Sequence, residues 1–289
     1  MIKLFLPTFN RSSKLARVLK TYALWRQPPE IFVFDGSDDP LHALENSRSA
    51  TLYDFVRYSH NIVSLTERCS LFIEACDNDD IFFMANDEDV YLESFCDLSF
   101  QMMSDSMSFS AVVGSYLTFW PPMISSMVPR LSIKKLIPCS FTLTGTLLQK
   151  ISMHIALNQS SKLPPLTYSP QRLSNFKEFV HHLSNAKIRA SAWELLLQFH
   201  LMSKGDIAFI PSIMLLRDET RINYQIEADR QGDSAYIEPQ EVEKVFDIIF
   251  GRSSDLSTYL NCIYSPPISG FFARFSRDSF VSSYLTPIT

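Results

Sequence analysis

The chain has 289 residues, of which 46% are hydrophobic and 20% are charged, a composition that excludes wholesale disorder. This length suits one large α/β unit or about two domains. A formal net charge of -5 argues against a surface built to bind nucleic acid. The five cysteines form no C-x-x-C pair, which indicates thiols in a reducing compartment, and the N-terminal apolar run is too short for a signal peptide. We therefore expect a cytoplasmic protein.

Apolar runs of strand length alternate with helical periodicity in the first half of the chain. The pattern predicts strands at 2–6, 30–34, 52–58, 81–84 and 109–117, and helices at 11–25, 64–75 and 91–103. Ser64 and Glu67 have the spacing of a capping box at the start of the second of these helices. Strands that alternate with helices indicate a parallel, doubly wound sheet over residues 1–117.

The second half of the chain has a more mixed pattern. It predicts strands at 140–146 and 206–210 and helices at 171–183, 191–203 and 239–259. Pro239 suits the first position of the last helix. The sequence therefore predicts one continuous α/β domain with a C-terminal helical extension.

Residues 106–129 contain no charged side chain. The serines and the pair Pro121 and Pro122 within this stretch argue against a membrane-spanning helix. We interpret it as the buried strand at 109–117 followed by an apolar loop that serves the acceptor site or core packing. Peripheral contact with a membrane is the alternative.

A short acidic tract, Asn86, Asp87, Glu88 and Asp89, follows the apolar strand at 81–84. Carboxylates in this position lie at the carboxyl edge of a sheet, where open α/β folds bind ligands. Residues two apart in an extended segment face the same way, so Asp87 and Asp89 can present paired oxygen ligands. Such ligands suit Mg or Mn bound to a substrate phosphate, whereas the alternative is an acidic turn that caps the next helix.

The spacing of the seven glycines excludes several nucleotide-binding motifs. No two glycines are close enough to form G-x-G, so the dinucleotide fingerprint, the Walker A loop and the glycine-rich loop of kinases are all missing. Any nucleotide bound by this chain is held mainly by other groups.

Four segments, taken together, resemble the family 2 glycosyltransferases of the GT-A fold. The segments run in the family's order over about residues 2–217: LFLPTFNR at 4–11, IFVFDGS at 31–37, DED at 87–89, and WE at 193–194 followed by KG at 204–205 and FIP at 209–211. The resemblance implies a Rossmann-like, mostly parallel mixed sheet flanked by helices. It divides the chain into a glycosyltransferase domain at 1–220, with a nucleotide-binding half at 1–117 and an acceptor half at 118–220, and an extension at 221–289.

The resemblance also assigns residues to the binding of a nucleotide-diphosphate sugar. It implies that Asp35 accepts a hydrogen bond from the nucleobase, while a turn aspartate before Gly36 is the alternative. The other implied donor-binding residues are Pro7, Thr8, Asn10, Arg11, Arg68, Asp87 and Glu88. For Arg68, a solvated helix arginine is the alternative.

Within the acidic tract, the resemblance implies that Asp89 ligates Mn or Mg and that Asp87 shares the metal or contacts the ribose. The cation would neutralise the charge that develops on the departing nucleoside diphosphate. The tract Asp77 to Asp80 precedes its strand, so it belongs to the opposite edge of the sheet.

Glu194 matches the position of the family's general base, which deprotonates the acceptor hydroxyl in an inverting transfer. Its alternative role is a glutamate that is favourably placed near a helix N-terminus. Arg217 matches a basic residue that follows the family's strand with the I-P motif, which corresponds to Ile210 and Pro211 here. The resemblance implies that Arg217 contacts the diphosphate, and an ion pair with a surface acid is the alternative. The chain departs from the family's pattern at two positions. Trp193 replaces the usual acidic neighbour of the base, and Phe34 replaces the first aspartate of the family's D-D-G-S motif, which corresponds to FDGS at 34–37 here.

Three hypotheses follow for the function. The first is a metal-dependent, non-processive, inverting glycosyltransferase of glycan or polysaccharide biosynthesis. It would act on a glycan, lipid-linked or protein acceptor and would have no nucleic-acid partner. The second is a sugar nucleotidyltransferase, which normally needs a glycine-rich signature after the first strand. The third is a degenerate relative that binds a partner through residues 106–129.

Overall fold

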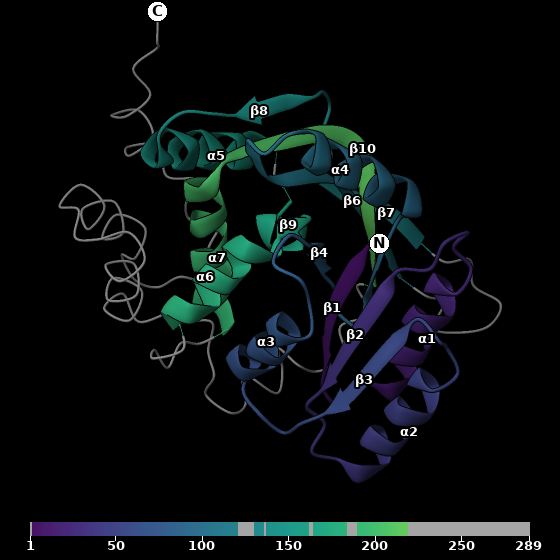
Figure 1. The fold of residues 1–289 in the computed structure, drawn as a ribbon. Coiled ribbons are helices and arrows are strands. Elements are labelled where there is room, and N and C mark those ends of the chain that lie inside the picture. Colours follow the sequence, from purple (N-terminus) through teal and green to yellow (C-terminus); the bar gives the residue numbers. More distant parts are fainter. Residues whose placement is uncertain (1, 121–129, 136, 162–163, 184–189, 219–289) are drawn as a thin grey trace, which may run out of the picture.

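The described residues form one mixed sheet of ten strands (Figure 1). The structure is a computed structural model that describes residues 2–120, 130–135, 137–161, 164–183 and 190–218. The strand order is β3-β2-β1-β4-β9-β6-β10-β5, with β7 paired to β6 and β8 paired to β10. The expected α/β fold with a mostly parallel mixed sheet flanked by helices is confirmed.

The first half of the chain builds four parallel strands and the helices between them. Its elements are β1 (Lys3–Thr8), α1 (Ser12–Tyr22), β2 (Glu30–Asp35), α2 (Pro40–Ala50), β3 (Val56–His60), α3 (Leu65–Glu74) and β4 (Ile81–Met84). Strand β1 pairs in parallel with both β2 and β4, and β2 pairs in parallel with β3. This is the alternating arrangement that the sequence predicts.

The second half adds antiparallel strands around one long parallel pair. Its elements are β5 (Asp89–Tyr91), α4 (Glu93–Asp105), β6 (Phe109–Trp120), β7 (Arg130–Lys135), β8 (Phe141–Leu143), α5 (Leu147–Ser161), the 3-10 helix η1 (Leu166–Tyr168), β9 (Gln171–Arg172), α6 (Leu173–Leu183), α7 (Ala190–Lys204) and β10 (Asp206–Asp218). Strand β10 runs parallel to β6 and antiparallel to β5.

Each face of the sheet is covered by its own apolar core, because successive strand residues point to opposite faces. Along β1, Phe5 belongs to one core, whereas Leu4 and Leu6 belong to the other. The first core includes residues of α3, α5, α6 and α7, and the second includes residues of α1, α2 and α4 (Figure 1). All four residues of β4 are buried, as expected for a strand that is covered on both faces.

Several elements were not predicted from the sequence, among them α2, β5, β7 and α5. Helix α2 begins with the side chain of Asp39 as its N-cap and Pro40 at its first turn, but Leu41 and Leu44 on it are exposed, so it has no clear apolar stripe. Strand β5 takes up the residues to Tyr91, and α4 therefore begins at Glu93 rather than at residue 91. Strand β7 and helix α5 lie where the sequence pattern predicts no element. The Ser64 and Glu67 capping box is confirmed.

The expected C-terminal extension, including the helix at 239–259, and the loop at 121–129 lie outside the described residues. The described parts of residues 1–117 and 118–220 contribute strands to the same sheet. Of the helices that the structure describes, none has the length and apolar composition that a membrane span requires.

Candidate functional site

The carboxyl edge of the parallel strands brings the predicted site residues together. Strands β1, β2 and β4 end at this edge with Thr8, Asp35 and the acidic tract. Strand β9 is antiparallel to both β4 and β6, so β6 and its parallel neighbour β10 end at the same edge. This orientation places Arg217, near the end of β10, beside the tract.

Asp89 and Arg217 form a bidentate ion pair across two antiparallel strands. They are direct partners in the register of β5 and β10. Arg217 Nε donates to Asp89 Oδ1 and Nη2 donates to Oδ2, both at 2.8 Å, and Asn86 Nδ2 also donates to Oδ2 at 3.2 Å. Burial disfavours the charged guanidinium, but the Asp89 carboxylate outweighs burial and raises the pKa of Arg217. Arg217 is therefore a permanent positive charge.

Tyr168 connects this pair to Glu194. The Arg217 Cζ atom lies 4.5 Å from the centroid of the Tyr168 ring. The Tyr168 hydroxyl accepts a hydrogen bond from Asn86 Nδ2 at 3.1 Å, and the Glu194 carboxyl group lies close enough to Tyr168 and Arg217 for both to lower its pKa. The structure thus brings Glu194 into the same cluster as Asp89, although the two residues are far apart in the sequence.

Part of the Glu194 residue, in α7, is exposed to solvent, but its carboxyl group is surrounded closely enough by protein atoms to be partly desolvated. Desolvation is the largest influence on its carboxyl group, and it raises the pKa of Glu194 together with the negative charge of Asp89, against the opposing effect of Arg217. An exposed carboxylate with a raised pKa suits a general base, since an acceptor can reach it and it can retain an abstracted proton.

Asp87 and Glu88 turn toward the start of α1. Thr8 Oγ1 donates to Asp87 Oδ2 at 2.7 Å, and Arg11 Nη1 donates to Asp87 Oδ1 at 3.0 Å and to Glu88 Oε2 at 3.2 Å. Lys14 Nζ also donates to Glu88, at 3.0 Å. Desolvation raises the pKa of Asp87 despite Arg11 and Thr8. Four predicted donor-binding residues, Thr8, Arg11, Asp87 and Glu88, therefore form one network of hydrogen bonds and ion pairs.

Asp35 is fully buried and its carboxylate is occupied by protein donors. Its oxygens accept hydrogen bonds from the Ser37 amide at 2.8 Å, Asn46 Nδ2 at 2.9 Å and the Tyr58 hydroxyl at 2.7 Å. Burial opposes ionisation, but these donors outweigh it and lower the pKa of Asp35. Such contacts hold the loop after β2, and the role of Asp35 as a direct nucleobase ligand stays a prediction.

Arg68 reaches from α3 to the ends of β1 and β2. Its Nη1 donates to the carbonyl oxygens of Thr8 at 3.4 Å and Phe34 at 3.5 Å. A Cβ atom at Gly36 would lie only 2.8 Å from this nitrogen, so glycine lets the guanidinium approach the backbone. The neighbouring Pro7, in parallel register with Phe34, lies in β1 at the same edge.

Asn10 shapes the turn between β1 and α1. It has a φ angle of 51°, a left-handed conformation that asparagine tolerates better than most residues. Its amide donates to Ser37 Oγ at 2.8 Å, and its Nδ2 donates to Asp38 Oδ1 at 2.6 Å. Asn10 therefore ties the first strand-to-helix turn to the loop after β2 and leaves Arg11 beside the acidic tract.

The carboxylates in this arrangement do not fit the metal site that the sequence predicts. Both oxygens of Asp89 bind the Arg217 guanidinium, and both oxygens of Asp87 accept protein hydrogen bonds. Within the described ranges, no three His, Cys, Asp or Glu side chains are arranged to hold a metal ion. Dependence on Mn or Mg stays a prediction that the structure does not support.

Sequence reasoning missed three contributors to the site. Tyr168 follows two prolines in a segment without a motif, and nothing local indicates its role. Asn86 was noticed only as part of the acidic tract. Lys14 looks like an ordinary helix residue, yet it is buried beside Glu88. A lysine in the first helical turn after the strand-to-helix loop is the one signal that the sequence offered, and its burial is known only from the structure.

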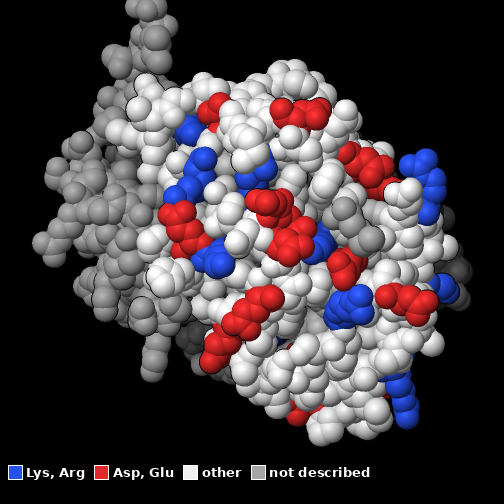
Figure 2. All heavy atoms as spheres, in the orientation of Figure 1, with Lys and Arg blue, Asp and Glu red and all other residues white. Residues whose placement is uncertain are grey.

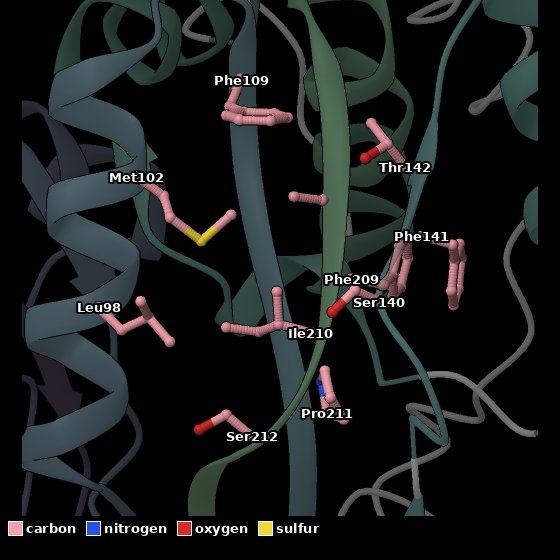
Figure 3. A pocket seen from close by; sticks show the side chains of 11 residues that line it. Leu98, Met102, Phe109, Ser140, Phe141, Thr142, Phe209, Ile210, Pro211 and Ser212 are labelled. Atoms are coloured by element: carbon pink, nitrogen blue, oxygen red, sulfur yellow. The ribbon is translucent and has the colours of Figure 1, made fainter.

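An apolar pocket of about 520 Å³ lies apart from this polar cluster. It is open to solvent and lies between α4 and β8, where Leu98 and Met102 face the early part of β10 (Figure 3). Phe141 and Phe209 stack nearby with centroids 4.5 Å apart. Acidic and basic side chains are intermixed on the face in Figure 2 and do not form a broad patch of one sign.

No family model matches this chain, and no curated protein matches it. Its fold is similar to a crystal structure of S. aureus TarS, residues 1–349, which is a glycosyltransferase. The two share 12% sequence identity and a TM-score of 0.51 over 88% of this chain and 73% of the TarS chain. This likeness concerns the fold alone, and with the sheet topology it shows that the chain has a Rossmann-like α/β fold of the GT-A type.

Proposed function

We propose that this protein is a glycosyltransferase that moves a sugar from a nucleoside-diphosphate donor to an acceptor hydroxyl group. The observation that carries the proposal is the meeting of Glu194 with the Arg217 and Asp89 pair at the carboxyl edge of the sheet. Open α/β folds bind ligands at this edge, and the GT-A type fold is compatible with the reaction.

The donor's base and phosphates have separate neighbours in this proposal. The backbone of Thr8 and Gly36 with the Arg68 guanidinium forms the side that receives the nucleobase. Arg11 and Arg217 lie on either side of the acidic tract and supply positive charge for the diphosphate. Guanidinium groups suit this task because their N–H groups match the spacing of phosphate oxygens.

Glu194 acts as the general base. The acceptor oxygen forms a bond to the anomeric carbon, the bond from that carbon to the diphosphate oxygen breaks with its electrons on the diphosphate, and the hydroxyl proton passes to Glu194. Attack opposite the leaving group inverts the sugar, and one sugar is transferred in each encounter. A glycan, a lipid-linked sugar or a protein hydroxyl is the proposed acceptor.

A panel of UDP-, GDP- and dTDP-sugars tests this function. Thermal shift identifies a donor that binds, and release of the nucleoside diphosphate with candidate acceptors measures transfer. Glu194→Gln should keep donor affinity within about twofold and lower turnover by about 10²-fold or more, because the amide cannot take up the proton.

The matched control is Glu178→Gln, which removes another carboxylate, one that pairs with Lys204 on the surface. It should leave turnover unchanged. Normal turnover by a folded Glu194→Gln protein would remove the base assignment. Failure of every donor to bind would reject the enzymatic function in favour of a binding protein.

A further inference from the structure

The acidic tract and Asp218 are balanced by four cationic side chains. Asp87 pairs with Arg11, Glu88 with Arg11 and Lys14, Asp218 with Arg17, and Asp89 with Arg217. These four carboxylates therefore face four positive groups, and Glu194, which lies near Asp89 and Arg217, is a further carboxylate of the cluster. A site built to bind a divalent cation would instead leave the carboxylates of the acidic tract unpaired for that cation.

In three of these five pairs, the cation is clearly the more exposed partner, and in a fourth, Arg11 with Glu88, the two side chains are almost equally exposed. The exposed fractions of the side chains are 26% for Arg11 against 4% for Asp87, 40% for Arg17 against 0% for Asp218, and 19% for Arg217 against 0% for Asp89. The pair of Lys14 and Glu88 has the opposite order. A charged ligand that approaches from solvent therefore meets mainly the positive partners, which favours an anion.

The Asp89 carboxylate is especially poorly suited to a metal. A ligating oxygen stands about 2.0–2.1 Å from Mg, and the same oxygens of Asp89 already accept two charge-assisted hydrogen bonds from Arg217. A divalent ion there would lie next to the guanidinium, and burial would strengthen their repulsion. Displacing Arg217 would leave its charge in a largely buried position without its acid partner.

We propose that Arg217 replaces the divalent cation at this site and that the protein binds the diphosphate of its donor without a metal. This inference rests on the proposed function. Asp89 and Tyr168 hold the guanidinium in place, and its partly exposed edge meets the phosphate oxygens. A guanidinium has five N–H groups, so two bonds to Asp89 leave donors for the ligand.

Calorimetric binding of UDP, GDP and dTDP, each with EDTA and with Mn, tests the inference directly. At least one nucleotide should bind with Kd values that agree within about twofold in the two buffers. A Kd that improves tenfold or more with Mn would overturn the inference while leaving the proposed function in place. Absence of binding in both buffers would overturn the proposed function and the inference together.

Arg217→Gln should weaken binding of that nucleotide in EDTA by about tenfold or more, because a contact with a charged group is lost. The control Arg57→Gln removes a surface arginine that pairs with Glu30, and it should change the Kd by less than about twofold. Unchanged affinity of a folded Arg217→Gln protein would overturn the role of Arg217.

The single variant leaves Asp89 buried opposite a neutral side chain and can fail to fold. The double variant Asp89→Asn, Arg217→Gln replaces the ion pair with two amides. Its affinity for the nucleotide in EDTA is measured in the same way, and the same loss of about tenfold or more is expected. Circular dichroism and thermal melting establish that each variant is folded. Paramagnetic resonance of Mn adds a separate measurement, since wild-type protein should leave the free Mn signal unchanged, and loss of that signal in stoichiometric titration would contradict the inference.

Discussion

Protonation of His200 should destabilise the helix that carries Glu194. His200 is buried in α7, where its Nε2 donates to the Asn175 carbonyl oxygen at 2.8 Å and its ring lies 5.4 Å from that of Phe179. Its Nδ1 atom has no hydrogen-bond partner among the described residues. A protonated ring would therefore place a charge in an apolar setting.

The structure gives the size and sign of this effect. Burial is the main cause that lowers the pKa of His200 from 6.5 to about 4; Lys204 and His182 act in the same direction, while the Asn175 hydrogen bond and Glu178 oppose it. As the pH falls, the unfolded chain takes up this proton first. Neutral His200 therefore contributes to the stability of the folded state above about pH 6.5, and this contribution is lost as the pH falls toward about 4. It amounts to roughly 3 kcal/mol of the free energy of unfolding.

Urea unfolding at about pH 7 and about pH 4.5 measures the effect. Between these values, His200 should account for about 2 kcal/mol of the lost free energy of unfolding. Because carboxyl groups also titrate, the quantity to compare is the loss in wild type minus the loss in His200→Phe. The control His181→Gln alters an exposed histidine of α6 and should keep the wild-type pH dependence. Equal losses in wild type and His200→Phe would refute the reasoning.

Three further outcomes are expected. Asp89→Asn should lower the free energy of unfolding by about 3–5 kcal/mol, and the double variant with Arg217→Gln should lose less than the sum of both single changes in urea unfolding. Asp35→Asn should lower stability by about 1–3 kcal/mol, since one amide oxygen cannot accept all three donors, and an unchanged melting temperature would contradict this. Gly114→Ala should cost about 1–3 kcal/mol by thermal melting, because a Cβ there would lie 2.5 Å from the Phe95 ring and 2.7 Å from the Ser212 oxygen; a neutral effect would show that α4 shifts freely.

The strands that the sequence predicts best are those with apolar residues on both faces. Strand β4 is such a run, and its burial on both sides is what makes it recognisable. Helix α2 escaped prediction because its start signals, Asp39 and Pro40, are not followed by a buried apolar stripe. Strand β5 is only three residues long, and its pairing with β10 cannot be inferred from its own composition.

The chemistry of the site was predictable in part. Glu194 and Asp89 were identified from short motifs, and the structure places them in one cluster. The partner of Asp89 was not predictable, because Arg217 lies 128 residues away and its pairing depends on the register of two strands. A carboxylate looks the same in sequence whether it binds a metal or a guanidinium. Its charged neighbours decide between the two, and the fold brings those neighbours together.

The pairing of β5 with β10 also bears on when the site can form during protein synthesis. The acidic tract and the first four parallel strands leave the ribosome well before residue 217, so Asp89 initially lacks the guanidinium that later neutralises it. Closing a loop of 128 residues carries an entropy cost that local helices do not. Domains assemble from the N-terminal side during translation, and this edge of the sheet should be among the last parts to become ordered.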